Sequence, residues 1–248
     1  MSHDSTPRDA ADTIRINKFF TEHGITSRRG ADRLVEEGRV TINGRRAVLG
    51  DVVSRRDEIA LDGKVQPWGQ ARVYIKYHKP TGITTTSEAH VEGNIIAAIG
   101  HPERIFPIGR LDKDSSGLIL LTNDGDLVNE VLRVEHGHER EYRVEVNRPI
   151  APGFVERMSR GVMVLGSLTR PCTVRQIGPR RFQIILTEGR NRQIRRMCEA
   201  LGYQVVALQR TRIMHLTLEG LALGTWQDLS SAELRELLRA VGRPVGGA

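Results

Sequence analysis

Cysteine is scarce in this sequence, and its scarcity excludes one class of extracellular protein. Only Cys172 and Cys198 occur among the 248 residues. Two thiols allow at most one bridge, so they cannot build the disulfide framework of a small secreted domain. Such low cysteine use fits a protein of the reducing cytosol.

Long apolar runs are also missing. No stretch reaches the roughly 20 apolar residues that a membrane-spanning helix needs. The N-terminal segment MSHDSTPRDAADT lacks the apolar region of a secretion signal. We therefore expect a cytoplasmic protein with no membrane segment.

The usual fingerprints of nucleotide cofactors and of zinc are absent too. The sequence has neither a P-loop nor the G-x-G-x-x-G pattern of dinucleotide binding. His136 and His138 form an H-x-H pair, but no nearby cysteine or carboxylate pattern completes a zinc-binding spacing. We expect neither a cofactor nor a metal ion.

Positive charge exceeds negative charge. Lysine and arginine number 37 against 30 acidic residues, which gives a net charge of +7 and a pI near 9.9. Clustered basic side chains neutralise phosphates, so the excess favours a polyanionic partner over the alternative of a merely basic soluble protein. Hydrophobic residues make up 39% of the chain, an ordinary share for a soluble protein that folds. The length leaves room for one large domain and a small module.

The first 66 residues predict a poorly ordered tail over residues 1–13 and a small module over residues 14–66. Apolar positions from Ile16 follow a helical stripe that Gly24 ends. Ser27 is placed to cap a second helix, which Gly38 stops. The Asn43–Gly44 pair between two β-prone runs predicts a hairpin, because both residue types tolerate positive φ. The module therefore reads helix, helix, hairpin.

A composition change near residues 65–72 indicates a domain boundary, since Pro67 and Gly69 interrupt both helical and strand patterns. We expect a second domain over residues 67–241 and a second poorly ordered tail over residues 242–248. Strands are predicted at VYIKYHKP, GLILLTND, EYRVEV and RFQIILTE. Helices are predicted over residues 194–201 and, from a Ser230–Glu233 capping box, over the last 11 residues before the tail. The class is α+β, with a mixed, largely antiparallel sheet flanked by helices, because regular βαβ alternation is missing.

The segment GRLDKDSSGLILLT combines charged residues with a buried strand. Arg110, Asp112 and Asp114 occupy alternate positions in a polar loop that leads directly into the apolar run. A carboxylate beside a rigid strand end is held in place, and a neighbouring arginine keeps it ionised. The alternative is a turn whose aspartates only bond local backbone. Ser115 is a poor nucleophile candidate, because Lys113 stands where a G-x-S-x-G elbow requires glycine.

Two further segments carry candidate functional side chains. EGRNRQIRRMCEALG packs four arginines around the start of a helix, which suits phosphate contact or an ion pair with a carboxylate. A solvated basic face is the alternative. In HEREYRVEV, Tyr142 shares a strand face with Val144 and Val146, so its ring points to the core or to a cleft.

The two segments GRLDKDSSGLILLTNDGDL and EGRNRQIRRMCEALGY closely resemble the diagnostic motifs of the RsuA/RluB/RluE/RluF family of bacterial rRNA pseudouridine synthases. INKFFTEHGITSRRGADRLVEEGRVTINGRRA resembles the S4 RNA-binding domain that many of these enzymes carry. The resemblance covers the chain from Ile14 to about Val241. HEREYRVEV, GVMVLGSLTRPC and TRIMHLTLEGLALGTWQDL look most like the RluF branch, which modifies 23S rRNA.

The resemblance implies a role for each matching residue. Asp112 matches the catalytic aspartate, Tyr142 the active-site tyrosine and Arg195 the basic residue that pairs with the aspartate. Arg110 matches the motif arginine that stabilises the flipped-out substrate. Further residues implied to bind RNA are Arg192 and the S4 side chains Arg15, Lys18, Arg28, Arg29 and Arg33.

The expected reaction breaks the N1–C1′ bond of uridine and joins C5 to C1′, with no net redox change or hydrolysis and therefore no need of a cofactor. Asp112 could stabilise the cationic C1′, attack it or remove a ribose proton, and the sequence leaves these three routes open. Alternatives to a 23S rRNA substrate are 16S rRNA or tRNA. A different class of function is a non-catalytic RNA-binding factor in ribosome assembly. We expect a monomer whose partner is RNA. The expected RNA is 23S rRNA, in an assembling large subunit.

Overall fold

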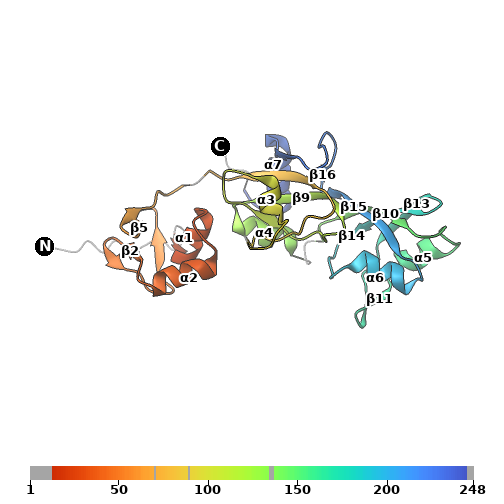
Figure 1. Cartoon of the computed structure of the whole chain (residues 1–248), viewed down its shortest axis with the longest axis horizontal. Helices are drawn as coiled ribbons and strands as arrows, with labels where there is room; N and C mark the ends of the chain where they lie inside the picture. The colour runs from red at the N-terminus through yellow and green to blue at the C-terminus, as the bar shows by residue number, and fades with distance from the viewer. Residues whose placement is uncertain (1–12, 70, 89, 134–136, 245–248) are drawn as a thin grey trace. The chain divides into compact units, whose positions relative to one another are not determined.

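The computed structural model describes residues 13–69, 71–88, 90–133 and 137–244. The expected tails fall mostly outside these ranges, as does His136. Contacts divide the chain into two compact units, one of Met1–Arg72 with Asn123–Gly125 and one of Val73–Thr122 with Asp126–Ala248. Each unit is described by itself (Figure 1).

The described residues of the first unit form two helices and six short strands. Its strands form a pair, β1-β4, and a four-stranded sheet in the order β3-β2-β5-β6. Its elements are β1 (Thr13–Arg15), α1 (Ile16–Glu22), α2 (Arg28–Glu36), β2 (Val40–Ile42), β3 (Arg45–Arg46), β4 (Val52–Ser54), β5 (Ile59–Leu61) and β6 (Lys64–Val65).

Local sequence explains how this unit begins and ends its elements. The Ser27 hydroxyl accepts a hydrogen bond of 3.1 Å from the Gly30 N–H and caps α2, as predicted. Asn43 and Gly44 have φ of 51° and 77° and turn β2 into β3, which confirms the predicted hairpin. Phe19 lies fully buried in the core, with the ring of Trp68 4.7 Å away in an edge contact.

The second unit is built on a nine-stranded sheet with the order β13-β14-β10-β15-β9-β7-β17, to which β16 and β8 add at β15 and β9. Its strands are β7 (Tyr74–Lys79), β8 (Phe106–Ile108), β9 (Ser116–Thr122), β10 (Arg140–Val146), β11 (Met163–Val164), β12 (Ser167–Leu168), β13 (Thr173–Gly178), β14 (Arg181–Leu186), β15 (Val205–Ile213), β16 (Leu216–Thr217) and β17 (Trp226–Asp228). Its helices are α3 (Ile95–Ile99), α4 (Gly125–Leu132), α5 (Phe154–Ser159), α6 (Gln193–Ala200) and α7 (Ser231–Ala240).

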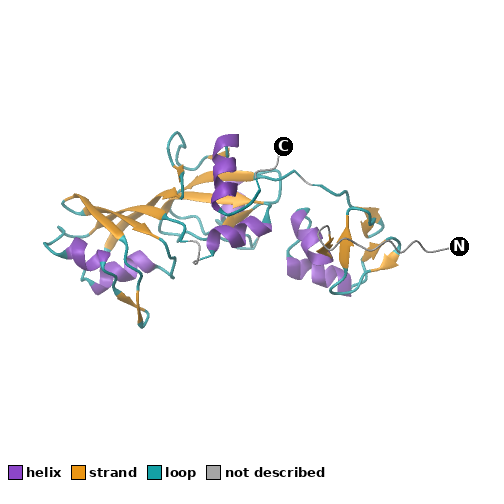
Figure 2. Ribbon diagram, turned by 180° about the vertical axis from the view of Figure 1, so that it is seen from behind, coloured by secondary structure: helices purple, strands orange, loops and turns teal. Residues whose placement is uncertain are grey.

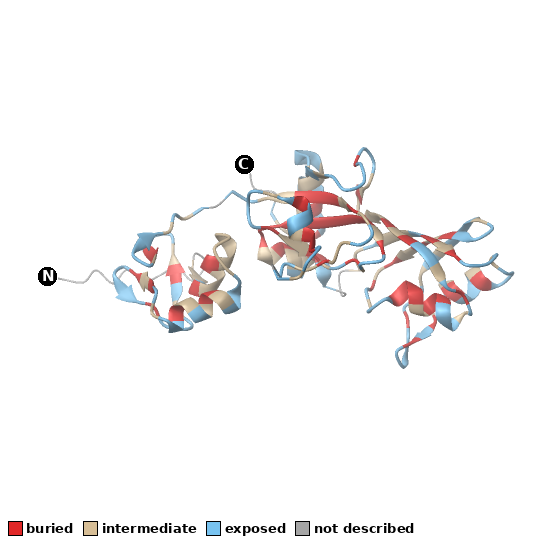
Figure 3. Cartoon of the chain, in the orientation of Figure 1, coloured by how far each residue is buried: buried red, intermediate tan, exposed pale blue. Residues whose placement is uncertain are grey.

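The sheet contains both parallel and antiparallel strand pairs. The side chains that each strand carries depend on whether one or both of its faces are covered. Strand β9 is buried on both faces: Leu118 and Leu120 belong to the cluster with α4 and α7, whereas Ile119 and Leu121 belong to the cluster with α3. A strand covered on both faces needs apolar side chains at every position, which accounts for the continuous run in the sequence (Figure 3). Strands β9 and β15 pair in parallel, and the remaining strand pairs in the described residues are antiparallel. The α+β class with a largely antiparallel sheet is confirmed.

The other half of the sheet is covered by helices on one face. Figure 2 shows helices α5 and α6 on one side of these strands. Phe154 and Met158 of α5 and Met197 of α6 pack with Val144 and Phe182 in one apolar cluster. The alternation of β10 therefore sends its even-numbered side chains, Tyr142 among them, to the covered face. The capping box at Ser230 and Glu233 begins α7, as predicted. No helix in the described parts of the chain is long and apolar enough to cross a membrane.

Gly117 allows β9 and β15 to approach closely. It has φ of 120°, and a Cβ there would lie 2.3 Å from the Arg210 carbonyl oxygen. Only glycine adopts this conformation without strain and leaves that space to the neighbouring backbone. The close approach lies immediately after the loop that carries Asp112, so it fixes that loop against β15.

Candidate active site

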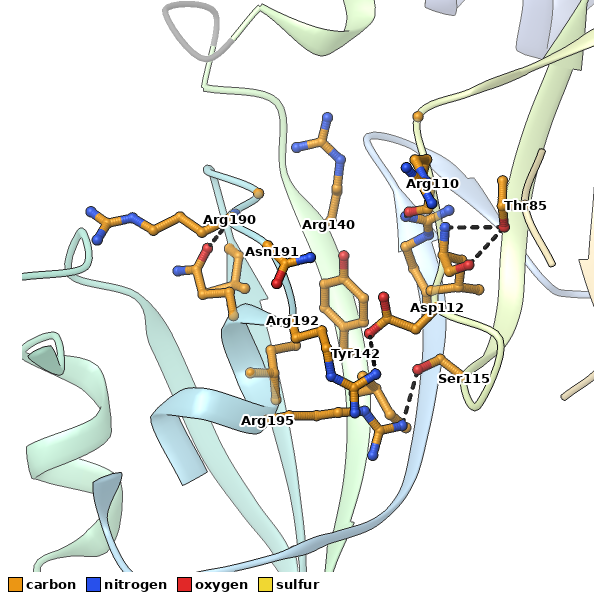
Figure 4. Close-up of a pocket in the computed structure, with 18 of the residues that line it drawn as sticks. Thr85, Arg110, Asp112, Ser115, Arg140, Tyr142, Arg190, Asn191, Arg192 and Arg195 are labelled. Atoms are coloured by element: carbon orange, nitrogen blue, oxygen red, sulfur yellow. Dashed lines mark hydrogen bonds and ion pairs between the residues drawn. The ribbon is translucent and has the colours of Figure 1, made fainter. Parts of the chain in front are cut away.

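A pocket of about 1040 Å³ opens in the second unit. It is lined by the loop at residues 109–115, by the first residues of β10, and by residues 188–195 at the start of α6 (Figure 4). These three segments are far apart in the sequence and are brought together by the sheet order. Both charged motifs and the predicted tyrosine therefore face one cavity.

Asp112 sits on a loop that is held from several sides. The Thr85 hydroxyl donates to the Leu111 carbonyl at 2.6 Å and accepts from the Leu111 N–H at 3.3 Å. The Gly82 N–H donates to the carbonyl of Lys113 at 2.7 Å. The Asp112 side chain is 33% exposed and lines the pocket. The loop thus presents a carboxylate of fixed position that a substrate can reach.

Arg192 is the arginine beside Asp112. Its Nη1 lies 3.5 Å from Asp112 Oδ2, and its guanidinium donates to both Asp114 oxygens at 3.3 and 3.2 Å. Burial alone would raise the pKa of Asp114, but the hydrogen bonds from Arg192 and the charge of Arg195 hold that pKa below its usual value. Arg192 has φ of 49°, a conformation that is unfavourable for an arginine. The backbone at the start of α6 is therefore held in a strained form that directs this side chain at the two aspartates.

Arg195 does not make the contact that was expected of it. Its Nη2 donates to the Asp114 carbonyl at 3.0 Å and to the Ser115 hydroxyl at 3.1 Å, and lies 3.3 Å from Asp114 Oδ2. The expected pairing with Asp112 is thus replaced by one with Asp114. The reason is depth: the Arg195 side chain is 10% exposed and reaches the base of the loop, whereas that of Arg192 is 42% exposed and lies at its rim.

Tyr142 lies on the pocket-facing side of β10, between Ile184 of β14 and Arg210 of β15 in the strand register. Its ring packs against apolar clusters on both sides. The hydroxyl makes no hydrogen bond to any residue in the described ranges. Figure 4 shows the ring beside Asp112, so a flat base and the carboxylate could be contacted together.

The sequence reasoning missed two arginines that flank Tyr142. Arg140 precedes Tyr142 by two residues on the same strand face, and its one hydrogen bond to a described residue is a 3.4 Å contact with the Val131 carbonyl. Burial lowers the pKa of its guanidinium, and the charge of Arg210 lowers it further. The strand alternation that placed Tyr142 in the cleft would also have placed Arg140 there.

Arg210 is the second of these arginines, and it is 3% exposed. Its Nε donates to the Leu118 carbonyl at 2.7 Å, and its Nη1 lies 3.5 Å from the Arg110 carbonyl. Its Nη2 is buried with no hydrogen-bond partner in the described residues. Nothing in the local pattern of β15 indicated this position, because it depends on the pairing of β15 with β9 and β10.

Lys79 supports the pocket indirectly, through the turn at residues 80–83. It is fully buried, and its Nζ donates to the carbonyls of Pro80 at 2.8 Å and Ile83 at 2.9 Å. Burial, together with the charge of Arg210, lowers the pKa of its ammonium group to about 8. The turn that it holds contains Gly82, which in turn bonds the Asp112 loop.

The remaining predicted residues divide between the two units. Arg110 lines the pocket, so it joins Asp112, Tyr142, Arg192 and Arg195 there. The basic residues expected to bind RNA in the first unit lie outside this pocket; Lys18 Nζ is 3.7 Å from Glu22, and the exposed ones are Arg15, Arg28, Arg29 and Arg33. No group of three or more potential metal ligands gathers within the described ranges.

Comparisons with known proteins agree with these segments. Residues 73–200 match the family model described as RNA pseudouridylate synthase, and residues 14–59 match that of the S4 domain. The dual-specificity RNA pseudouridine synthase RluF of Escherichia coli (strain K12) is 48% identical over 231 residues, which cover 92% of this chain and 80% of that protein. The ribosomal large subunit pseudouridine synthase B of Bacillus subtilis (strain 168) is 33% identical over 90% of this chain and 95% of its own. A crystal structure of a pseudouridylate synthase superposes with a TM-score of 0.66 at 28% identity, and covers 90% of this chain and 99% of that one.

Proposed function

Since this chain belongs to the RNA pseudouridylate synthase family, we propose that Asp112 is its catalytic carboxylate and that its substrate is a uridine of 23S rRNA. The enzyme is an isomerase that converts uridine to pseudouridine in RNA. The observation that carries the assignment of Asp112 is its place in the pocket, on a braced loop with Arg192 3.5 Å away and Tyr142 lining the same cavity.

The reaction breaks the N1–C1′ bond, turns the uracil and forms the C5–C1′ bond. The C5 hydrogen leaves as a proton and N1 gains one, so the product is an isomer of the substrate. As N1 departs, C1′ becomes electron-poor, and an ionised carboxylate beside it lowers the barrier. We assign that task to Asp112. Arg192 then stabilises the ionised carboxylate and orients it, while Arg195 holds the loop by bonding Asp114 and Ser115.

Tyr142 is proposed to have two tasks. Its ring offers a surface on which the flipped uracil stacks. This stacking offsets part of the few kcal/mol that it costs to remove the uridine from its stack in the RNA. Its hydroxyl, which bonds no described residue, is available to assist removal of the C5 proton after the bond to C1′ has formed.

The two units divide the work in this proposal. Residues 14–66 would form the RNA-binding domain and residues 67–241 the catalytic domain. The exposed side chains of Arg15, Arg28, Arg29 and Arg33 are suited to backbone phosphates, which give affinity without reading sequence. We also propose that the protein acts as a monomer, in the cytoplasm, where ribosomal RNA is modified.

The choice of 23S rRNA rests on resemblance. The segments most like the RluF branch lie in both halves of the catalytic domain, and the relative from Bacillus subtilis is named for the large ribosomal subunit. The name of the relative from Escherichia coli carries the words dual-specificity, which favours including a second RNA in any test.

The direct test is tritium release from RNA labelled at C5 of uridine, with 23S rRNA, 16S rRNA and bulk tRNA as separate substrates. Forming the C5–C1′ bond expels the C5 hydrogen, so each turnover releases one label. Release from 23S rRNA supports the proposal. Release from 16S rRNA or tRNA alone would replace the substrate, and release from none, either as free RNA or as immature ribosomal particles, would favour a non-catalytic assembly factor.

Arg140→Gln tests whether the half-buried guanidinium beside Tyr142 binds a backbone phosphate of the target RNA. Arg140 lacks a carboxylate partner in the described residues, so a phosphate would fill that place. The variant is expected to raise KM about tenfold and to reduce the slope of log(kcat/KM) against log salt by about one unit. Steady-state kinetics over a range of salt concentrations measure both quantities.

Two further variants make that experiment decisive. Arg140→Lys keeps the charge and should restore most of the salt slope. Arg235→Gln removes an exposed arginine of α7 outside the pocket and should change neither quantity. An Arg140→Gln enzyme with a raised KM and an unchanged salt slope would show that Arg140 supports the fold and does not bind phosphate.

A further inference from the structure

A small hairpin beside the pocket exposes an unusual amount of apolar surface. Strands β11 and β12 form this hairpin, residues 163–168, in which Met163 pairs with Leu168 and Leu165 stands at the turn. The three side chains are 59%, 57% and 63% exposed, respectively. Single exposed apolar residues are ordinary on protein surfaces, but three on a six-residue hairpin form a patch that indicates an interaction.

Leu165 is an unfavourable residue for the turn of this hairpin. Leu165 has φ of 52° and Gly166 has φ of 78°, the signs that a tight hairpin turn requires at both positions. The first unit solves the same problem with Asn43 and Gly44, the favoured pair. A leucine in the left-handed region is strained, and its side chain packs against no core here. Folding alone therefore does not account for leucine at this turn.

The hairpin is nevertheless held rigidly. At its base the Thr169 N–H donates to the Val162 carbonyl at 3.0 Å, and the Val162 N–H donates to the Thr169 hydroxyl at 3.0 Å. Gly161 lies so close that a Cβ there would meet the Thr169 carbonyl oxygen at 2.4 Å. A patch presented on such a base is fixed in direction, which lowers the entropy cost of binding.

Arg190 connects this hairpin to the catalytic pocket. Its Nη1 donates to the Ser167 hydroxyl at 2.8 Å and to the Ser167 carbonyl at 3.1 Å, and its Nη2 donates to the Leu168 carbonyl at 2.7 Å. Arg190 itself lines the pocket. A ligand in the pocket therefore lies beside Arg190, and Arg190 in turn contacts the hairpin directly.

We infer that Leu165, with Met163 and Leu168, packs against unstacked bases of the RNA beside the target uridine. This inference rests on the proposed function. When a uridine leaves its stack, the neighbouring bases expose their apolar faces, and aliphatic side chains can insert there. RNA is favoured over a protein partner because exposed arginines flank the hairpin in the sequence, at Arg157, Arg160 and Arg170.

Leu165→Asn separates this role from a structural one, because the two predict opposite results. Asparagine tolerates positive φ, so the variant should fold at least as well and raise Tm by about 2 °C. The lost apolar contact should raise both KM and the Kd for protein-free 23S rRNA about fivefold. Leu223→Asn is the matched control, since Leu223 is 61% exposed outside this hairpin, and it should leave KM and Kd unchanged.

The outcomes are distinct. Tm held or raised together with weaker binding of free RNA supports the inference, and Leu168→Thr should then weaken binding in the same direction. Unchanged KM and Kd would overturn it, as would a defect seen with ribosomal particles but not with free RNA, which would indicate a protein partner. Wild-type turnover tests the proposed function separately, and if it were absent the Kd comparison would still decide the role of the hairpin.

Discussion

Replacing Asp112 by Asn is expected to lower kcat by about 10⁴-fold or more, which is the scale seen when a central catalytic group is removed. The amide has nearly the shape of the carboxylate, so the braced loop and the pocket should persist. What is lost is the negative charge that faces C1′ while the glycosidic bond breaks. Single-turnover tritium release with saturating enzyme measures the loss without interference from substrate binding.

The same variant should bind RNA as tightly as wild type or slightly more tightly, because a negative charge near the phosphates has been removed. Asp228→Asn, at an exposed carboxylate of β17 outside the pocket, controls for the general effect of losing one charge. Residual turnover within tenfold of wild type in Asp112→Asn would refute the assignment of the catalytic carboxylate.

Tyr142→Phe is expected to lower kcat by about 10²-fold while leaving thermal stability unchanged. The predicted loss is the contribution of one positioned acid–base group. Stability should hold because the Tyr142 hydroxyl bonds no residue in the described ranges and phenylalanine keeps the packing of the ring. Tritium release and thermal unfolding measure the two effects.

Tyr203→Phe provides the opposite control. The Tyr203 hydroxyl accepts a 3.0 Å hydrogen bond from the Ala151 N–H, away from the pocket lining. Its loss should cost about 1 kcal/mol of stability and leave kcat unchanged. If Tyr142→Phe retained full turnover while Tyr142→Leu lost it, the ring alone would be required and the proton-transfer role would be abandoned.

Elements that depend on neighbouring residues were predictable without coordinates. Ser27 and Ser230 begin their helices because a hydroxyl can satisfy the free N–H groups of a first turn wherever the sequence places it. The Asn43–Gly44 turn follows from the φ that these two residue types accept. The apolar run of β9 is typical of a strand that is buried on both faces, and the pocket-facing side of Tyr142 follows from the two-residue period of a strand.

The set of residues that meet in the pocket could not be predicted from neighbouring residues, because it depends on which distant segments of the chain come together. Resemblance and motif chemistry identified the acid, the tyrosine and the arginine-rich helix start, but the partner of each arginine was set by helix position and depth. Arg192 therefore lies beside Asp112, and Arg195 reaches Asp114 instead. Arg210 joins the pocket only because β15 pairs with both β9 and β10. Short-range backbone preferences are encoded residue by residue, whereas contacts between β9, β10, β15 and α6 arise from the packing of the whole sheet, which no local pattern contains.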